Sequence, residues 1–137
     1  MSGRGILDTN AVILLPRLGD PAALPAEPVI TTITLAELSV GPLVASNDIE
    51  RAARQAHLQQ AESDFEALPF DAAAARAFGR VVSELRSAGR KTSARAYDAL
   101  IASVAISQDL PLYTANAGDF RGISGLDLVE VAVPDEP

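Results

Sequence analysis

The amino-acid sequence predicts a three-layer α/β/α domain with a mainly parallel central sheet, and two patterns indicate this class. Short apolar or β-branched runs of strand length alternate along the chain with longer segments whose apolar residues recur at helical spacing. Strands that alternate with helices favour parallel pairing through right-handed crossovers. At 137 residues, 48% of them hydrophobic, the chain is long enough for one such core. We expect a single domain over residues 1–133 and a flexible tail over residues 134–137.

The first part of the chain contains two expected strands, each followed by a helix. The apolar run Gly5–Leu7 predicts a buried strand, and a helix follows over residues 10–18. A proline-rich loop then leads to the β-branched run over residues 29–33, which predicts the second strand. A helix is expected from Thr34 to about residue 44.

The rest of the chain is expected to be mainly helical. Apolar residues at helical spacing predict three helices, over residues 48–67, 72–87 and 93–108. Gly89 is a natural stop after the second of these. Two further strands are expected over residues 110–114 and 126–133, with a turn or a single helical turn between them at residues 116–120.

Composition and charge narrow the possible functions. The chain has no cysteine, which excludes a disulfide framework and a thiolate metal site. Its first apolar run is interrupted by Asp8 and is too short for a signal peptide or a membrane span, so we expect a soluble, cytoplasmic protein. The net charge of -7 argues against binding nucleic acid through bulk electrostatics.

Any contact with nucleic acid must therefore rest on local positive charge. The densest basic group is Arg86, Arg90, Lys91 and Arg95, and arginine suits bidentate phosphate contacts. A solvated helix end and loop explains each of these residues equally well.

Three polar residues, Asp8, Thr9 and Asn10, directly follow the first expected strand. In open α/β sheets, ligands bind beyond the carboxyl ends of the strands, where loops carry the chemistry. Any one of the three could also cap the following helix. Because a cap needs only one of them, we favour a functional role for Asp8.

Glu37 follows the second expected strand and has two interpretations of equal weight. Thr34 and Glu37 match a capping box, in which the threonine oxygen and the glutamate bond each other's backbone amides. The same early-helix position also directs a carboxylate toward the crevice that holds Asp8. Sequence spacing does not choose between the two.

Asp98 is the most informative carboxylate, because it shares a helix face with Ile101 and Ala105. An ionised carboxylate on an apolar face persists only if a cation, a metal or several donors compensate it. The alternative is an ion pair with Arg95 one turn earlier, which contributes little at an exposed site. We favour a ligand role.

A third polar group follows the strand that ends near Thr114. It contains Asn116 and Asp119, which could form another helix cap. It is also a further strand end that delivers polar groups to the same edge of the sheet. Each of the four segments therefore places one carboxylate at a strand exit or early in a helix: Asp8, Glu37, Asp98 and Asp119.

Four carboxylates in one crevice repel one another and would be partly protonated without a compensating charge. Magnesium or manganese supplies that charge, prefers oxygen ligands and retains water. Such a site supports hydrolysis of phosphodiester bonds, and the cation also provides the positive field that the acidic chain lacks.

These residues resemble, in order, the motifs of PIN-domain proteins, specifically the VapC-type toxins of bacterial toxin–antitoxin pairs. The matching segments are Leu7–Asn10, Ile33–Leu38, Tyr97–Ala102 and Tyr113–Phe120. The resemblance implies a PIN-like fold and a metal-dependent ribonuclease that cuts structured or messenger RNA and so arrests translation. It further implies a homodimer, held inactive by a cognate VapB-type antitoxin.

The resemblance also implies roles for individual residues. Asp8, Glu37 and Asp98 would hold Mg2+ or Mn2+, and Asp119 would complete the acidic set. The supporting residues are the nearby hydroxyls of Thr9 and Thr114, then Asn10, which orients ligands or simply starts the helix, and Asn116, which shares the fourth position or orients Asp119. Related proteins often have a second helix before the Thr-Glu motif, whereas the prolines here predict a short helix or none.

Three other functions compete with this one. A catalytically weak PIN-like module that binds RNA or a partner is the main alternative. A haloacid-dehalogenase-type phosphatase needs a second aspartate where Asn10 stands, and a receiver domain needs a lysine after a late strand, whereas Lys91 precedes a helix.

We expect His57 to be solvated rather than catalytic. Exposed apolar residues of the third and fourth helices are expected at dimer or antitoxin contacts, although core packing explains many of them.

Overall fold

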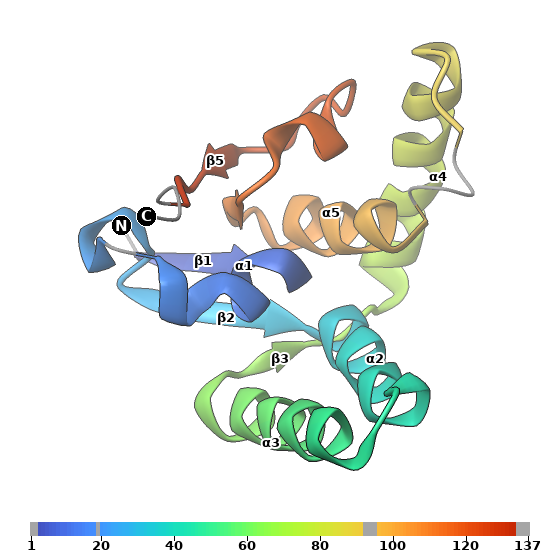
Figure 1. Cartoon of the computed structure of the whole chain (residues 1–137). Helices are drawn as coiled ribbons and strands as arrows, with labels where there is room; N and C mark the ends of the chain where they lie inside the picture. The colour runs from blue at the N-terminus through green and yellow to red at the C-terminus, as the bar shows by residue number, and fades with distance from the viewer. Residues whose placement is uncertain (1–2, 19, 92–95, 134–137) are drawn as a thin grey trace.

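The computed structural model describes residues 3–18, 20–91 and 96–133, and their arrangement confirms the predicted α/β class (Figure 1). One sheet runs in the order β3-β2-β1-β4-β5, and every neighbouring pair is parallel. The strands are β1 (Arg4–Leu7), β2 (Glu27–Thr31), β3 (Ala67–Leu68), β4 (Leu112–Thr114) and β5 (Leu128–Glu130). The sequence predicted all of them except β3, which is only two residues long.

Five α-helices are described: α1 (Thr9–Leu14), α2 (Thr32–Val40), α3 (Asp48–Asp64), α4 (Ala72–Ser87) and α5 (Ala96–Gln108). Short 3-10 helices are η1 (Leu15–Arg17), η2 (Pro21–Ala23), η3 (Gly41–Val44) and η5 (Ala117–Phe120). The helix expected over residues 72–87 is confirmed at both ends. Residues 93–95 and the expected tail at 134–137 lie outside the described residues.

Several helix ends differ from the prediction, and proline explains two of them. α1 and α2 stop at Leu14 and Val40, and each continues as a 3-10 turn that contains Pro16 or Pro42. Proline has no N–H to donate to the preceding helical turn, so the α-helical bonding pattern ends there. α3 ends at Asp64, because the following residues join the sheet as β3.

Helices cover both faces of the sheet, which gives the predicted three layers (Figure 1). Ile6 and Val29 pack on one face, in a core that includes Ala74 of α4 and Ile101 of α5. Successive residues of a strand point to opposite faces. The next residues of the same strands, with residues of α1, α2 and α3, form the core of the other face: Leu7, Ala11, Val12, Ile30, Leu38 and Ala61.

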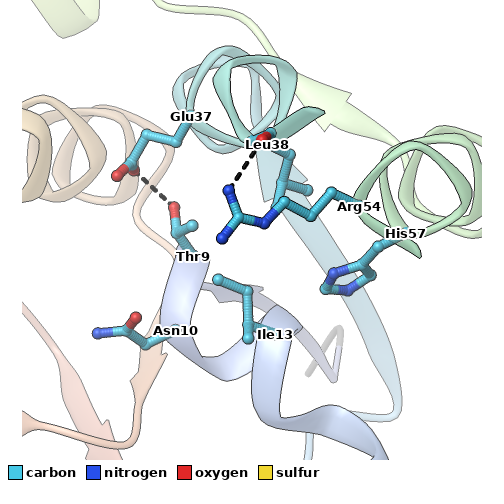
Figure 2. Close-up of a pocket in the computed structure, with 8 residues that line it drawn as sticks. Thr9, Asn10, Ile13, Glu37, Leu38, Arg54 and His57 are labelled. Atoms are coloured by element: carbon cyan, nitrogen blue, oxygen red, sulfur yellow. Dashed lines mark hydrogen bonds between the residues drawn. The ribbon is translucent and has the colours of Figure 1, made fainter. Parts of the chain in front are cut away.

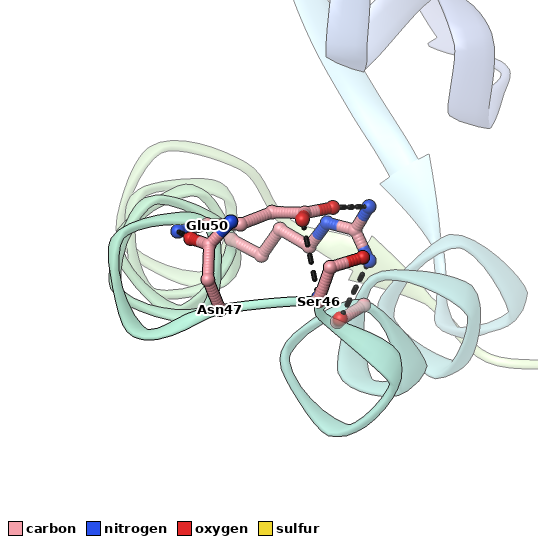
Figure 3. A network of polar contacts seen from close by, with 5 residues as sticks. Ser46, Asn47 and Glu50 are labelled. Carbon is pink, nitrogen blue, oxygen red and sulfur yellow. Dashed lines mark hydrogen bonds and ion pairs between the residues drawn. The ribbon is translucent and has the colours of Figure 1, made fainter.

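The connection from α2 to α3 is fixed by a polar network (Figure 3). Asn47 caps α3 by accepting a 2.8 Å hydrogen bond from the backbone N–H of Glu50. The Glu50 carboxylate accepts a 3.1 Å bond from the N–H of Ser46 and forms an ion pair with Arg54. Arg54 also donates a 2.9 Å bond to the carbonyl of Gly41. Arg54 is thereby held close to the end of α2.

Four of the exposed large apolar side chains lie at this connection, which corrects the prediction for the fourth helix. Within the described ranges, α4 has no large exposed apolar side chain. The patch is instead formed by Val40, Leu43, Val44 and Ile49, and Leu43 and Ile49 are 84% and 85% exposed.

Two further features follow from the described residues. Between α1 and β2 they form only the 3-10 turns η1 and η2, as the prolines predicted. No helix among them is long and apolar enough to cross a membrane.

Candidate active site

The candidate site lies at the carboxyl ends of β2, β1 and β4. From β1 the chain proceeds to β2 on one side, whereas β4 lies on the other side of β1. This reversal of strand order creates a crevice, and ligands in open α/β sheets bind at such a point. Asp8 directly follows β1, Thr114 ends β4, and α2 begins directly after β2.

Asp8 lies at the centre of this crevice and is only 3% exposed. Its Oδ1 accepts a 2.8 Å hydrogen bond from the N–H of Ala11, so Asp8 does cap α1. Burial is the main cause that raises the pKa of Asp8, and the charges of Asp119 and Glu37 raise it further. Hydrogen bonds from Thr114 and Ala11 oppose this shift.

The cap alone does not account for a carboxylate at Asp8. Serine or asparagine caps a helix about as well as aspartate does. Neither places a negative charge in a buried position next to two other carboxylates, an arrangement that lowers stability unless a cation compensates it. The structure therefore assigns Asp8 a cap function and leaves its buried charge to be explained by ligand binding.

Glu37 lies across the crevice on α2 and is held by Thr9. The Thr9 hydroxyl donates a 2.7 Å hydrogen bond to Glu37 Oε1 (Figure 2). The Thr9 and Thr34 hydroxyl oxygens are 2.9 Å apart and share a hydrogen bond. These contacts tie the start of α1 to α2.

The structure excludes one of the two interpretations of Glu37. The N-cap of α2 is Thr31, whose hydroxyl accepts a 3.3 Å hydrogen bond from the N–H of Thr34. The capping box of Thr34 and Glu37 is therefore wrong, because Thr34 already lies inside the helix. Glu37 bonds Thr9 of a different element, as a residue of the crevice does.

The third group of polar residues follows β4. Thr114 is fully buried, and its hydroxyl oxygen accepts a 3.0 Å hydrogen bond from the N–H of Asn116. Asp119 lies in η5 and is half-buried, and its charge acts on Asp8. Asn116 precedes η5 but its side chain makes no capping hydrogen bond, so the predicted cap is wrong.

Asp98 lies in the first turn of α5 and is half-buried. Ile101 and Ala105 on the same face are fully buried, as the spacing predicted. The charges of Asp119 and Glu37 raise the pKa of Asp8. Arg95, its alternative partner, lies outside the described residues, so that ion pair stays a prediction.

The donor set suits a hard cation, although the side chains do not form a closed cage. In the described part of the chain, no three His, Cys, Asp or Glu side chains are grouped closely enough to hold a metal ion among them. Magnesium is usually bound through one or two carboxylates and keeps several waters. Carboxylates, hydroxyls and a buried negative charge fit such an ion, and the available carboxylate donors are Asp8 together with Glu37 and Asp119, whose charges raise the pKa of Asp8.

A pocket of about 420 Å³ opens beside Glu37 between α1, α2 and α3 (Figure 2). Asn10 is exposed and lines it, together with Ile13 of α1. His57 is half-buried and also lines this pocket, and its expected solvated, non-catalytic state stays a prediction. The hydrogen-bonded pair of Thr9 and Glu37 forms another part of its wall.

The predicted basic residues lie at and beyond the end of α4. Arg86 and Lys91 are exposed, whereas Arg90 is half-buried and lines a second pocket of about 530 Å³ beside η5. Arg121 lines the same pocket, and sequence reasoning missed it. The only available signal was its position directly after the last acidic motif.

The fold and the crevice define the class of protein, and the comparisons with known proteins agree. Residues 6–126 match the model of the PIN domain, so the chain belongs to the PIN-domain family. Ribonuclease VapC5 of Mycobacterium tuberculosis is 40% identical over 129 residues, which cover 93% of each protein. Within the family, the chain belongs with the VapC ribonucleases.

Solved structures show the same similarity. The crystal structure of VapBC-5 from Mycobacterium tuberculosis, a member of the VapBC family of toxin–antitoxin systems, superposes with a TM-score of 0.81 and 36% identity. The match covers 94% of this chain and 99% of that one. VapBC2 from Rickettsia felis, bound to a promoter DNA fragment, gives a TM-score of 0.75 and 26% identity over 91% and 96% of the two chains.

Proposed function

We propose that this protein is a metal-dependent endoribonuclease toxin, which hydrolyses RNA phosphodiester bonds to inhibit translation and is neutralised by a cognate VapB-type antitoxin. The observation that carries this proposal is the buried carboxylate of Asp8 at the reversal of strand order. Burial and the charges of Glu37 and Asp119 raise its pKa, so its ionised form is unfavourable without a cation. Membership in the VapC ribonucleases supports the reaction class.

In this proposal Asp8, Glu37, Asp98 and Asp119 hold Mg2+ or Mn2+. When bound, such a cation neutralises charge on the scissile phosphate and lowers the pKa of water. We place Asp119, rather than Asn116, in the acidic set because its charge acts on Asp8, whereas Asn116 is exposed.

The remaining polar residues position the carboxylates. Thr9 holds Glu37 by a 2.7 Å hydrogen bond, and Thr114 bonds Asp8 from the end of β4. Thr114 is held in turn by the 3.0 Å bond from the N–H of Asn116. Glu37 and Asp8 are thus each oriented by a hydroxyl from another segment, in the way that hydrogen bonds from neighbouring residues orient metal ligands.

The partners proposed for the chain are RNA, the antitoxin and a second copy of itself. The exposed apolar patch of Val40, Leu43, Val44 and Ile49 supports a protein partner, because such patches commonly mark interaction sites. The solved VapBC assemblies support the antitoxin as that partner.

The decisive experiment is cleavage of defined RNAs by the purified protein. A panel of transfer, ribosomal and messenger RNAs is incubated with Mg2+, with Mn2+ or with a chelator, and the products are mapped by primer extension. We expect internal cuts that need the divalent cation and are lost in Asp98→Asn. The control is Glu62→Gln, which removes the charge of an exposed carboxylate on α3 that belongs to none of the four motifs.

The alternative is a PIN-like module that binds RNA or a partner without cutting. Intact RNAs under all conditions, with binding that is equal in the wild type and Asp98→Asn, would establish that alternative and reject the nuclease.

A further inference from the structure

The second pocket, beside η5, shares one wall with the candidate active site. Its lining residues come from the loop after α4 and from the segment around η5: Ala88, Arg90, Asn116, Gly118, Asp119, Arg121 and Gly122. Asp119 belongs to both places, because it lines this pocket and its charge also acts on Asp8. A ligand in the pocket would therefore lie directly next to the carboxylate site.

Several contacts hold the two walls of the pocket together. Glu84 near the end of α4 accepts hydrogen bonds of 2.6 and 2.7 Å from the N–H and the hydroxyl of Ser124. Arg90 donates a 2.9 Å bond to the carbonyl of Arg121. The pocket is thus built on a fixed connection between α4 and the segment after η5.

Two arginines, Arg90 and Arg121, line this pocket. Arg4, Arg51 and Arg54 each form an ion pair with an acidic side chain. Among the residues that the structure describes, neither Arg90 nor Arg121 forms one. Arg90 uses one N–H for the carbonyl of Arg121, and a guanidinium has five donors in all.

One nitrogen of the Arg121 guanidinium lies near Gly118 of η5. A Cβ atom built on Gly118 would lie 3.7 Å from Arg121 Nη2 and 3.5 Å from Asn116 Oδ1. The glycine therefore leaves room beside the guanidinium group for one further carbon atom at ordinary contact distance. An arginine that lines a surface pocket and forms no ion pair among the described residues, next to the proposed nuclease site, suits the binding of a phosphate.

We infer that this pocket binds a backbone phosphate of the RNA beside the one that is cleaved, with Arg121 and Arg90 as its ligands. This inference rests on the proposed ribonuclease function. It explains how a chain with a net charge of -7 holds a polyanion, since two arginines supply positive charge only where the strand must lie. Phosphate contacts position the strand and do not read its sequence.

The test compares RNA binding by charge-removing variants in an Asp98→Asn background with Mg2+, which keeps the RNA intact. Fluorescence anisotropy with short labelled single-stranded RNAs gives Kd over a range of salt concentrations. We expect Arg121→Gln to weaken binding about fivefold or more for every sequence, and to lower the slope of log K against log salt by about 0.7, the value for one phosphate contact on a single strand. The matched control is Arg76→Gln, which removes the same charge from a surface pocket elsewhere on α4.

A second variant tests the pocket without changing charge. Gly118→Ala places a methyl group at ordinary contact distance from Arg121 and Asn116, so the chain should fold while the space is filled. We expect Gly118→Ala to weaken RNA binding. Because this variant leaves the net charge unchanged, a long-range effect of charge alone predicts unchanged binding.

The outcomes separate this inference from the proposed function. Equal losses in Arg121→Gln and Arg76→Gln, or unchanged binding in Arg121→Gln and Gly118→Ala, reject the phosphate pocket even when the wild type cleaves RNA. Failure of the wild type to cleave any RNA rejects the proposed function, whereas the salt slopes still report whether the pocket binds phosphate.

Discussion

The hydroxyl of Thr9 and the carboxylate of Glu37 are joined by a 2.7 Å hydrogen bond across the crevice. The bond connects the residue that follows Asp8 with the second turn of α2, two segments that are 28 residues apart in the sequence. It therefore sets the position of one carboxylate of the site relative to another.

Replacing Thr9 by valine tests this positioning role. Valine keeps the shape of threonine but cannot donate a hydrogen bond to Glu37. We therefore expect the affinity for Mg2+ to fall about 10- to 100-fold, as when other residues that hydrogen-bond a metal ligand are removed. Isothermal titration measures the affinity, and RNA cleavage at saturating Mg2+ should recover part of the lost rate. Thr9→Ser retains the hydroxyl and should bind Mg2+ like the wild type; an equal loss in both variants would contradict the role of the hydrogen bond.

Asp8→Asn is expected to stabilise the metal-free protein and to abolish cleavage. The amide oxygen can still accept the bond from Ala11, while the buried charge is removed. Replacements that remove an unfavourable charge from an active site commonly raise the free energy of unfolding by about 1 kcal/mol. Thermal unfolding at pH 7 measures this increase.

The same variant carries a pH test. Because the pKa of Asp8 is raised in the folded state, its charge destabilises the fold above that pKa, and the penalty disappears as the carboxyl is protonated. The difference in Tm between Asp8→Asn and the wild type should therefore shrink as the pH falls from 7 toward 3.8, the ordinary value for aspartate. A difference that grows on acidification would contradict the direction of the shift.

Added Mg2+ or Mn2+ should raise the Tm of the wild type, because an ion that binds only the folded state stabilises it by mass action. At 100 times Kd the gain is about 2.7 kcal/mol. Scanning calorimetry with and without a chelator measures it. Asp8→Asn should show a much smaller shift, and Glu62→Gln an unchanged one; equal shifts in all three proteins would place the ion elsewhere.

Glu84 gives a second pH-dependent prediction, of opposite sign to that of Asp8. Its hydrogen bonds from Ser124 hold the pKa of this carboxyl below the usual value, so it stabilises the fold when ionised. That stabilisation is complete above the unfolded pKa and is lost as the pH falls through the lower folded pKa. Glu84→Gln should therefore lower Tm at pH 7, with a difference that vanishes at acidic pH; Glu62→Gln serves as control.

The sequence determined the fold class and the identity of the candidate carboxylates. Strand-length apolar runs that alternate with helical patterns specify a parallel sheet, because such runs bury both faces only between layers of helices. The polar residues after β1 and β4 were recognised for a local reason, since they interrupt apolar runs. The helix α4 was predicted to the residue from its apolar spacing and from Gly89 after its end, and Asp71 caps it in the structure.

Only the tertiary structure decided what these residues contact. Strand β3 was missed because two residues carry no periodicity, and only pairing with β2 makes them a strand. Local spacing left Glu37 between a cap and the site; the structure excludes the capping box because Thr31 caps α2, and it shows a hydrogen bond from Thr9 of another element. Arg121 and Arg90 also line one pocket only because the fold brings together two segments that are 31 residues apart. Local patterns encode helices and strands, whereas contacts between distant segments depend on strand order, which no short stretch of sequence contains.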